Sequence, residues 1–278
     1  MAYIAGNNFS NTLFGTDGTD LIYGYNGSDT IYGGASVDYI NGGRGDDRLF
    51  GEGGDDVFEI GGSGSDTGLS PAGGLNGGWD SFDGGSGYDT IRIWPTAFYE
   101  WTAIMVNSIV NVEALDNASG GPGYVYFRGA VDFSGITSMT NIDEFRGDSS
   151  SNTFLGSELD ERVYGFAGND VLRGNGGGDR LFGGDGNDTL DGGTGFNLLW
   201  GEAGADTFHF SSAGRNFVMD FSSLEGDVFK ISTDIAPDFA ALKIFDDGGM
   251  ANIQANGLDI LLFRVPSSSL SESDFVFV

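Results

Sequence analysis

The stretch Gly183-Gly184-Asp185-Gly186-Asn187-Asp188-Thr189-Leu190-Asp191 decides the fold, because close copies of it recur every nine residues. In each copy, or row, the sixth position is Asp, Asn or Glu and the eighth position is apolar. A strict period of this kind is the signature of a repeat solenoid. The rows begin at Gly6, Gly15, Gly24, Gly33, Gly42 and Gly51, and again at Gly147, Gly156, Gly165, Gly174, Gly183, Gly192 and Gly201.

Each row divides into a turn and a short strand. The chain holds 50 glycines, and glycine at positions one to six supplies positive φ and lets carbonyl groups approach closely. Positions seven to nine form a strand whose eighth side chain points inward. Two rows make one coil, and coils stack at about the 4.8 Å spacing of neighbouring strands. The sequence therefore predicts an all-β parallel solenoid.

The charge pattern indicates a metal. Forty-one acidic residues oppose 12 basic ones, for a net charge of −29, which disfavours nucleic acid as a partner. A merely solubilising surface would scatter its carboxylates, but here Asp20 and Asp38 stand one coil apart, and so do Asp170 and Asp188. Stacked carboxylates and carbonyl groups offer the six or more oxygens that calcium prefers. The alternative is that these aspartates only favour turns.

These rows resemble the RTX (repeats-in-toxin) family, whose consensus GGxGxDxUx the row at Gly183 matches throughout. The resemblance covers about half of the chain. It implies a right-handed parallel β-roll with several Ca²⁺ ions in its turns, held by sixth-position aspartates and by carbonyl groups of the glycine turns. The candidate ligands are Asp20, Asp29, Asp38, Asp47, Asp56, Asp66, Asp80, Asp89, Asp170, Asp179, Asp188 and Asp206, with Gly18, Gly27, Gly45, Gly168, Gly177 and Gly186.

The resemblance also predicts ligand pairs that lie one coil apart. These pairs are Asp20/Asp38, Asp29/Asp47, Asp38/Asp56, Asp170/Asp188 and Asp188/Asp206, while Asp179 faces Asn197. Some rows depart from the consensus, with Asn11, Asn152, Asn197 and Glu161 in place of aspartate and Phe9, Ser36, Ser150 and Leu159 in place of the fourth glycine. We expect the first rows of each block and the Asp179/Asn197 pair to bind calcium weakly or not at all.

Four segments follow from the pattern: a first block at 1–92, a linking segment at 93–146, a second block at 147–209 and a C-terminal segment at 210–278. Residues 70–74 are predicted to form a loop. Residues 108–115 echo residues 138–145, which predicts wider rungs of one solenoid. The alternative is a separate insert with its own core around Trp94, Phe98, Tyr99 and Trp101.

Residues 210–278 are expected to be a β cap, because a solenoid otherwise ends on an open edge. The segments 217–221 and 226–231 resemble the strands that follow the repeats in serralysin proteases. The ending Ser273-Asp274-Phe275-Val276-Phe277-Val278 resembles the type I secretion signal of those proteases. The alternative is an ordinary final strand.

Several classes of site are disfavoured by composition. The chain has no cysteine and one histidine, which excludes thiolate and multi-histidine metal sites. It lacks a cleavable signal-peptide pattern at its beginning, a long apolar span, an HExxH motif and a GxSxG motif. We expect no enzyme, with His209 facing solvent or packing; an unrecognised active site in 93–146 is the alternative.

The expected function is that of a secreted, extracellular calcium-binding protein, exported by the type I secretion machinery of a Gram-negative cell, with a structural or surface-interaction role. It would resemble the small secreted RTX proteins of such bacteria. The alternative is a calcium-dependent polysaccharide-binding module similar to the R-modules of mannuronan epimerases. An anionic polymer would then need basic patches, and Arg44, Arg48, Arg173 and Arg180 are the basic residues clustered in the rolls.

Overall fold

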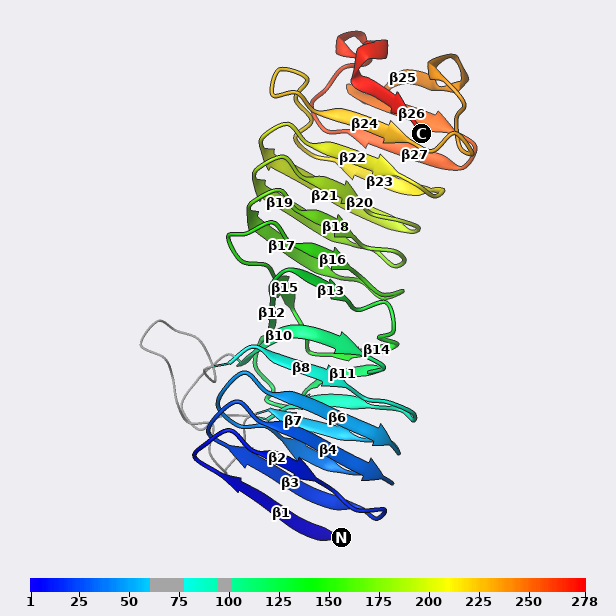
Figure 1. Ribbon diagram of the computed structural model, residues 1–278. Coiled ribbons are helices and arrows are strands. Elements are labelled where there is room, and N and C mark those ends of the chain that lie inside the picture. The colour runs from blue at the N-terminus through cyan, green and yellow to red at the C-terminus, as the bar shows by residue number, and fades with distance from the viewer. Residues whose placement is uncertain (61–77, 95–101) are drawn as a thin grey trace. The chain divides into compact units, whose positions relative to one another are not determined.

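The computed structural model describes residues 1–60, 78–94 and 102–278. The chain forms two compact units, Met1–Glu144 and Phe145–Val278, each described by itself. Their regular secondary structure is almost entirely β-strand (Figure 1), and most strands pair in parallel, which confirms the predicted solenoid. The expected loop at 70–74 and the candidate ligand Asp66 lie outside the described residues, as do Phe98, Tyr99 and Trp101.

Unit 1 contains two parallel sheets. Sheet I has the order β1 (Ala2–Asn7), β3 (Asp20–Tyr25), β5 (Tyr39–Asn41), β7 (Val57–Ile60), β9 (Thr90–Ile93), β11 (Ala114–Asn117) and β14 (Ser138–Thr140). Sheet II has the order β2 (Thr12–Phe14), β4 (Thr30–Ala35), β6 (Arg48–Gly53), β8 (Asp80–Asp83), β10 (Thr102–Val110) and β12 (Gly123–Phe127). The short strand β13 (Ala130–Asp132) follows β12 in the chain.

Unit 2 repeats this plan. Sheet III has the order β15 (Glu144–Arg146, which begins at the last residue of unit 1), β17 (Arg162–Ala167), β19 (Arg180–Asp185), β21 (Phe196–Ala203), β23 (Gly214–Val218), β27 (Leu258–Leu262), β26 (Met250–Ala255) and β25 (Lys243–Asp247). Sheet IV has the order β16 (Thr153–Leu155), β18 (Val171–Arg173), β20 (Thr189–Asp191), β22 (Thr207–Phe210), β24 (Val228–Ile231) and β28 (Phe275–Phe277).

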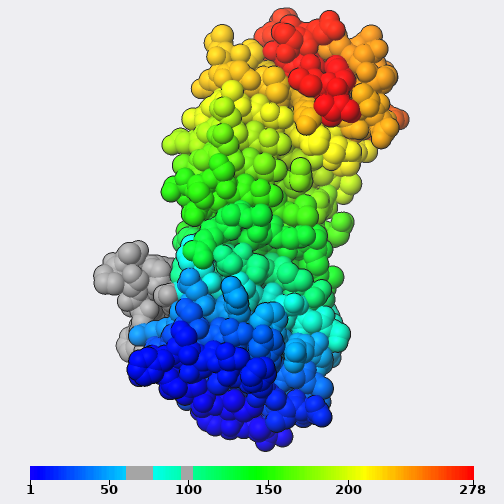
Figure 2. Space-filling model, in the orientation of Figure 1, coloured from blue at the N-terminus to red at the C-terminus, as the bar shows by residue number. Residues whose placement is uncertain are grey.

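The pairing register equals the length of two rows. Ile22 of β3 pairs with Ile40 of β5, and Leu181 of β19 pairs with Leu199 of β21, in each case two rows further along the chain. Consecutive rows therefore alternate between the two sheets of a unit, and residues one coil apart lie in neighbouring layers. Figure 2 shows these layers as successive bands of colour within each unit.

The eighth-position side chains form the core, as the pattern predicts. Because side chains alternate across a strand, position eight faces inward while positions seven and nine face outward. In unit 1 these residues include Ile22, Ile31, Ile40, Leu49 and Phe58, each at most 1% exposed. In unit 2 they are Phe154, Val163, Leu172, Leu181, Leu190, Leu199 and Phe208, all at 0%. Leu13, in the outermost row of unit 1, is only half-buried.

The stack of coils in unit 1 resumes after each change of spacing. Leu49 of β6 pairs with Phe82 of β8, beyond the interruption in the repeat, and Phe58 pairs with Ile91. Strands β10, β11, β12 and β14 then extend sheets I and II in parallel. Parts of the echo segments 108–115 and 138–145 do lie in neighbouring parallel strands, with Leu115 paired to Met139, so the 30-residue spacing of the echo is not the pairing register.

The C-terminal segment continues both sheets of unit 2. Strand β27 pairs in parallel with β23, and β28 pairs in parallel with β24. Strands β25 and β26 then add an antiparallel hairpin to sheet III, and three short 3₁₀ helices connect the strands, η1 (Phe239–Ala241), η2 (Ser267–Ser269) and η3 (Glu272–Asp274). No helix in the described parts of the chain is long and apolar enough to cross a membrane.

Candidate metal sites

The sixth-position residues form ladders along the turns of each unit. In unit 1 the backbone N–H of Asp20 donates to Asp38 Oδ1 at 2.7 Å, and that of Asp38 donates to Asp56 Oδ1 at 2.8 Å. In unit 2 the N–H of Asp170 donates to Asp188 Oδ1 at 2.7 Å. The structure thus brings together the predicted pairs Asp20/Asp38, Asp29/Asp47, Asp38/Asp56, Asp170/Asp188 and Asp188/Asp206.

Two ladders run along each unit. In unit 1 they are Asn11–Asp29–Asp47–Asp80 and Asp20–Asp38–Asp56–Asp89–Glu113. In unit 2 they are Asn152–Asp170–Asp188–Asp206–Asp227 and Glu161–Asp179–Asn197–Asn216. Asp80 and Asp89 join their ladders 33 residues after Asp47 and Asp56, across the interruption in the repeat.

The second oxygen of most of these carboxylates is buried and accepts no hydrogen bond. A buried polar atom without a partner is rare and costly, and more so when it carries charge. These residues are at most 3% exposed, so their unpartnered oxygens lie away from bulk solvent. A row of such atoms calls for positive charge at the turns. The atoms are Asp29 Oδ2, Asp38 Oδ2, Asp56 Oδ2, Asp89 Oδ2, Asp170 Oδ2, Asp188 Oδ2 and Asp206 Oδ2.

The first glycine of a row has no side chain, and the space that a Cβ atom would take lies beside this oxygen. A Cβ atom added to Gly33 would lie 2.9 Å from Asp38 Oδ2 and 2.7 Å from the carbonyl oxygen of Gly51 in the next coil. A Cβ atom added to Gly183 would likewise lie within 3.0 Å of Asp188 Oδ2 and of the Gly201 carbonyl oxygen. A carboxylate oxygen and a carbonyl oxygen therefore converge on one point, which a side chain would fill.

Positive φ occurs at other positions of the turn. Among the predicted fourth-position glycines, Gly27, Gly45, Gly168, Gly177 and Gly186 have φ between 94° and 142°. Gly18 does not share this conformation, so it differs from the prediction. Residues at position two of a row also adopt positive φ, and some of them are not glycine, such as Glu52 (φ 72°) and Phe166 (φ 77°). Such residues cost about 1–2 kcal/mol each in that conformation, a strain that the rest of the turn must offset.

Burial changes the proton affinity of the ladders. Burial, with a smaller effect of neighbouring carboxylates, raises the pKa of Asp38 to about 6 and of Asp56 to about 7. In unit 2 burial raises the pKa of Asp188 to about 6 and that of Asp206 to about 7. Asp20 is the exception: burial opposes the shift, but donors from Ala2 and Thr16 outweigh it and lower its pKa. Most of the ladder therefore holds charge that its surroundings do not stabilise.

The ladder Glu161–Asp179–Asn197–Asn216 differs from the others. Burial and the Glu161 carboxylate raise the pKa of Asp179 to about 9, while burial raises that of Glu161 to about 7. As predicted, Asp179 faces Asn197, whose Oδ1 accepts its N–H at 2.9 Å. The four residues of this ladder thus hold fewer charges than Asp170–Asp188–Asp206.

Two ladder ends, Asp227 and Glu113, were not predicted. Asp227 accepts the N–H of Asp206 at 2.9 Å and that of Ser222 at 2.8 Å, so both of its oxygens are hydrogen-bonded. Glu113 accepts from Asp89 at 2.8 Å. Asp227 follows Asp206 by 21 residues and Glu113 follows Asp89 by 24, so a search at fixed spacing misses them. An acidic residue one coil beyond the last row is the signal that would have found them.

The geometry fits a hard cation. Across residues 1–60, 78–94 and 102–278 no cluster of three or more histidine or acidic side chains forms a metal centre by itself. Calcium takes six to eight oxygen ligands, so backbone carbonyl groups would have to supply most of them. The glycine turns place such carbonyl groups beside the buried carboxylate oxygens. The sixth-position aspartates and these carbonyl groups are the groups that would hold Ca²⁺.

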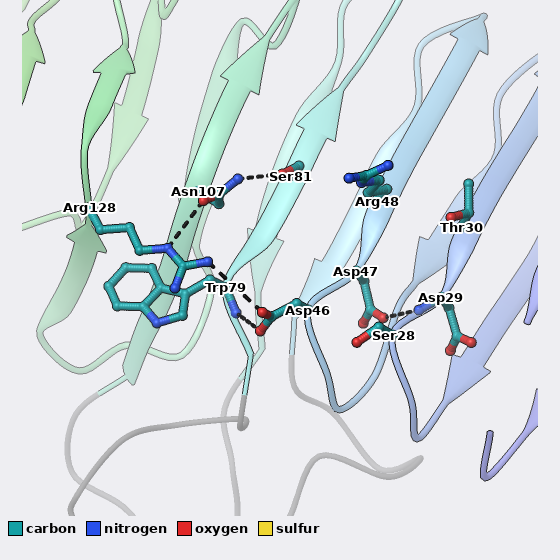
Figure 3. Close-up of a pocket in the computed structure, with 10 residues that line it drawn as sticks. All are labelled: Ser28, Asp29, Thr30, Asp46, Asp47, Arg48, Trp79, Ser81, Asn107 and Arg128. Atoms are coloured by element: carbon teal, nitrogen blue, oxygen red, sulfur yellow. Dashed lines mark hydrogen bonds and ion pairs between the residues drawn. The ribbon is translucent and has the colours of Figure 1, made fainter. Parts of the chain in front are cut away.

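A polar pocket of about 340 Å³ lies on sheet II of unit 1, beside the turns (Figure 3). Arg128 lies over the Trp79 ring, 4.8 Å from its centroid, and its Nε donates to Asn107 Oδ1 at 3.1 Å. Asn107 in turn donates to Ser81 Oγ at 3.1 Å. Arg48, an exposed residue, also lines this pocket.

His209 packs against an acidic residue. Its Nδ1 lies 3.2 Å from Asp191 Oδ2, and its side chain is 18% exposed. Asp191 also accepts a hydrogen bond from Ser211 Oγ at 2.7 Å. This agrees with the expected packing position, and Asp191 lies outside the sixth-position ladders.

Comparisons with known proteins identify the repeats. The model of the RTX calcium-binding nonapeptide repeat matches residues 5–67, 75–91 and 146–212, about half of the chain. No curated protein sequence matches the chain.

Two solved structures show partial similarity. The AlgE6R3 subunit of the Azotobacter vinelandii mannuronan C5-epimerase is 29% identical, with a TM-score of 0.37, over 44% of this chain and 80% of that one. The extracellular lipase LipA of Serratia marcescens is 17% identical, with a TM-score of 0.25, over 96% of this chain. The match spans only 40% of the lipase.

Proposed function

Because this chain belongs to the family of RTX calcium-binding nonapeptide repeat proteins, we propose that it is an extracellular protein that folds as its repeats bind several calcium ions. RTX repeats are calcium-binding rather than catalytic elements. The proposed role is structural, or the display of a surface outside the cell. That the chain has no catalytic activity stays a prediction.

The buried carboxylate oxygens carry this proposal. Asp38, Asp56, Asp170, Asp188 and Asp206 each use one oxygen to accept a backbone N–H from the neighbouring coil. The other oxygen is buried without a donor. A carboxylate in that state favours binding of a proton or a cation. Because each unit holds several such carboxylates, neutralisation of the ladders and closure of the coils become one event.

Coupling between binding and folding follows from linkage. Calcium supplies the positive charge that the turns lack. The unfolded chain cannot hold residues of successive coils in contact, so a cation that binds only the folded form stabilises that form by RT ln(1 + [L]/Kd). Extracellular calcium modules bind with Kd of about 10⁻⁴–10⁻³ M. Export of a poorly folded chain through a type I channel, followed by folding outside, is the route that we propose.

Calcium binding itself tests the proposal. We expect calorimetric titration to show several calcium ions per chain, and Asp188→Asn to bind fewer. Asp185→Asn is the matched control, because it makes the same change of charge three residues earlier at an exposed position. No binding to the unaltered protein, or an equal loss in both variants, would overturn the proposal.

The pocket on sheet II favours a second candidate, the binding of an acidic polysaccharide. It places Arg48 and Arg128 beside Ser81 and Asn107, but Asp29, Asp46 and Asp47 line it too. Arg128 Nη2 already lies 3.9 Å from Asp46 Oδ2, so Arg48 is the guanidinium group open to a ligand. Guanidinium groups pair well with carboxylates. Binding of an oligouronate that is lost in Arg48→Gln and retained in Arg215→Gln would support this candidate. No binding to the unaltered protein would exclude it.

A further inference from the structure

Asn197 occupies a ladder position as the aspartates do, but with a different atom in the buried site. Its Oδ1 accepts the N–H of Asp179 at 2.9 Å, just as Asp188 Oδ1 accepts the N–H of Asp170 at 2.7 Å. Its side chain is 0% exposed. A Cβ on the first glycine of its row, Gly192, would meet Asn197 Nδ2 at 2.6 Å. At Gly183 the corresponding atom is Asp188 Oδ2. Nδ2 of Asn197 therefore stands where the aspartates place their unpartnered oxygen.

That nitrogen finds acceptors within the turn. Asn197 Nδ2 lies 3.4 Å from the carbonyl oxygen of Gly193 and 3.2 Å from Asn216 Oδ1. Two oxygen atoms thus lie within hydrogen-bonding distance of this nitrogen. In an aspartate row a carboxylate oxygen faces such surroundings with no donor, while in the Asn197 row an amide donates to them. The orientation of the amide is fixed because Oδ1 is held by Asp179.

We propose that the side-chain amide of Asn197 takes the place of a calcium ion in the turn 192–197, which therefore closes without metal. This inference rests on the proposed function, because it presumes that the aspartate turns bind calcium. It makes the two ladders of unit 2 unequal. The ladder through Asp170, Asp188 and Asp206 depends on calcium, and the turn at Asn197 does not.

Other asparagines use the same chemistry at coil turns. Asn117, which is 0% exposed, donates from Nδ2 to the carbonyl oxygens of Gly121 at 2.8 Å and Asn141 at 3.0 Å. Asn152, 1% exposed, donates to the Ser150 carbonyl oxygen at 2.9 Å. Asn117 lies outside the nonapeptide rows, in coils of unit 1 that carry no predicted ligand. An amide donor to the turn carbonyls is therefore a recurrent means of closing a coil in this chain.

The test changes one atom of the side chain. Asn197→Asp replaces the donor with an oxygen that faces Gly193 and Asn216, so the turn would need a cation. We expect native mass spectrometry to show one more calcium ion per chain than in the unaltered protein. Asp170→Asn, the reverse change in the opposite ladder, is the matched control and should bind one ion fewer. We also expect Asn197→Asp to need a higher calcium concentration than the unaltered protein to fold.

A second measurement does not depend on the variant. Anomalous diffraction from crystals of the unaltered protein grown with calcium should show ions in the turns 165–170, 183–188 and 201–206, and none at 192–197. An ion at 192–197, or an Asn197→Asp variant with unchanged stoichiometry, overturns the inference while leaving the proposed function intact. A protein that binds no calcium at all overturns both.

Discussion

In most aspartate rows the sixth-position carboxylate combines two roles in one group. One oxygen joins neighbouring coils through a backbone N–H, and the other is buried without a donor. The first role holds the register of the solenoid, and the second makes it sensitive to whatever cation or proton is present. Aspartate suits both, because its short side chain reaches only the adjacent coil.

Acidification should stabilise the calcium-free protein. Burial raises the pKa of Asp56 and Asp206 to about 7 in the folded state, whereas the pKa of an aspartate in the unfolded chain is about 3.9. The folded state therefore binds more protons, so the stabilisation is full below about pH 4 and is lost as the pH rises through about 7. We expect the unfolding temperature of the calcium-free protein to be higher at pH 5 than at pH 7.5.

High salt separates this effect from the general charge of the chain. At about 1 M salt the Debye length is about 3 Å, which screens exposed charges but not buried ones. The pH dependence should persist there and should be smaller in Asp56→Asn. An unfolding temperature that is equal or lower at pH 5 would contradict the assignment of these groups.

The sequence predicted which side chains line the turns, but not how they act. Phase alone placed Asp20, Asp38 and Asp56 one above another. It could not show that Oδ1 of each is already committed to an N–H, because that depends on the backbone path of the turn. Asp227 was missed because its row is longer than nine residues. The roles of these residues as calcium ligands stay predictions.

The turn is the element that limits substitution most strictly. In unit 1, Gly33→Ala would place a methyl group 2.7 Å from the Gly51 carbonyl oxygen and 2.9 Å from Asp38 Oδ2. We expect this variant to lose calcium affinity and to cost about 1–3 kcal/mol of stability, as overpacking does.

Gly135→Ala provides the comparison in the same unit. The nearest atom to its added Cβ is the Val112 carbonyl oxygen at 3.7 Å, and its φ is not left-handed. Its unfolding temperature and calcium midpoint should stay close to those of the unaltered protein. Equal effects of the two substitutions on calcium binding would show that calcium binding does not depend on a glycine at the first position of the row.

The sheets carry a second source of stability that needs no metal. On the outer face of sheet III, the Phe182 ring stacks between Tyr164 at 4.5 Å and Trp200 at 4.3 Å, with interplanar angles of 6° and 12°. Phe14, Tyr32 and Phe50 stack in the same way on sheet II. Because the ring faces cover one another, these columns join coils rather than offer a platform to a ligand.

Phe182→Ala should weaken unit 2 with or without calcium. Each aromatic pair contributes about 0.5–1.5 kcal/mol beyond its buried area, and this change removes two pairs. Phe166→Ala is the control, because Phe166 is 48% exposed and stacks at the margin of the column, against Tyr164. The loss in unfolding free energy should be similar at two calcium concentrations that both keep the protein folded. A loss that grows with the calcium concentration would contradict a metal-independent role.

Sequence periodicity predicted the strands where the period is strict and failed where it changes. The apolar eighth position located the core residues from Ile22 to Phe58, because only inward-facing positions must be apolar. It did not predict that Leu115 pairs with Met139, because turns between 102 and 140 have several lengths. No local pattern fixes register when coil length varies, since the choice depends on packing against the previous coil.

The molecule as a whole has a charge that opposes its own compaction. Its net charge is −29, and many of the carboxylates lie in ladders with coil-to-coil contacts. Divalent ions in the turns would remove much of this repulsion where it is strongest. Stability should therefore rise with calcium concentration beyond what ionic strength explains, and magnesium should act weakly because it releases its water ligands reluctantly.

The central claim is that calcium binding and folding are one event, and a calcium titration followed by far-UV circular dichroism and gel filtration tests it most directly. Starting in chelator, we predict a gain of β signal together with a smaller hydrodynamic radius as calcium rises, over the same concentration range. Matched additions of sodium chloride should not reproduce it. A chain that is already compact and β-structured in chelator, with an unfolding temperature that calcium does not change, would contradict the account.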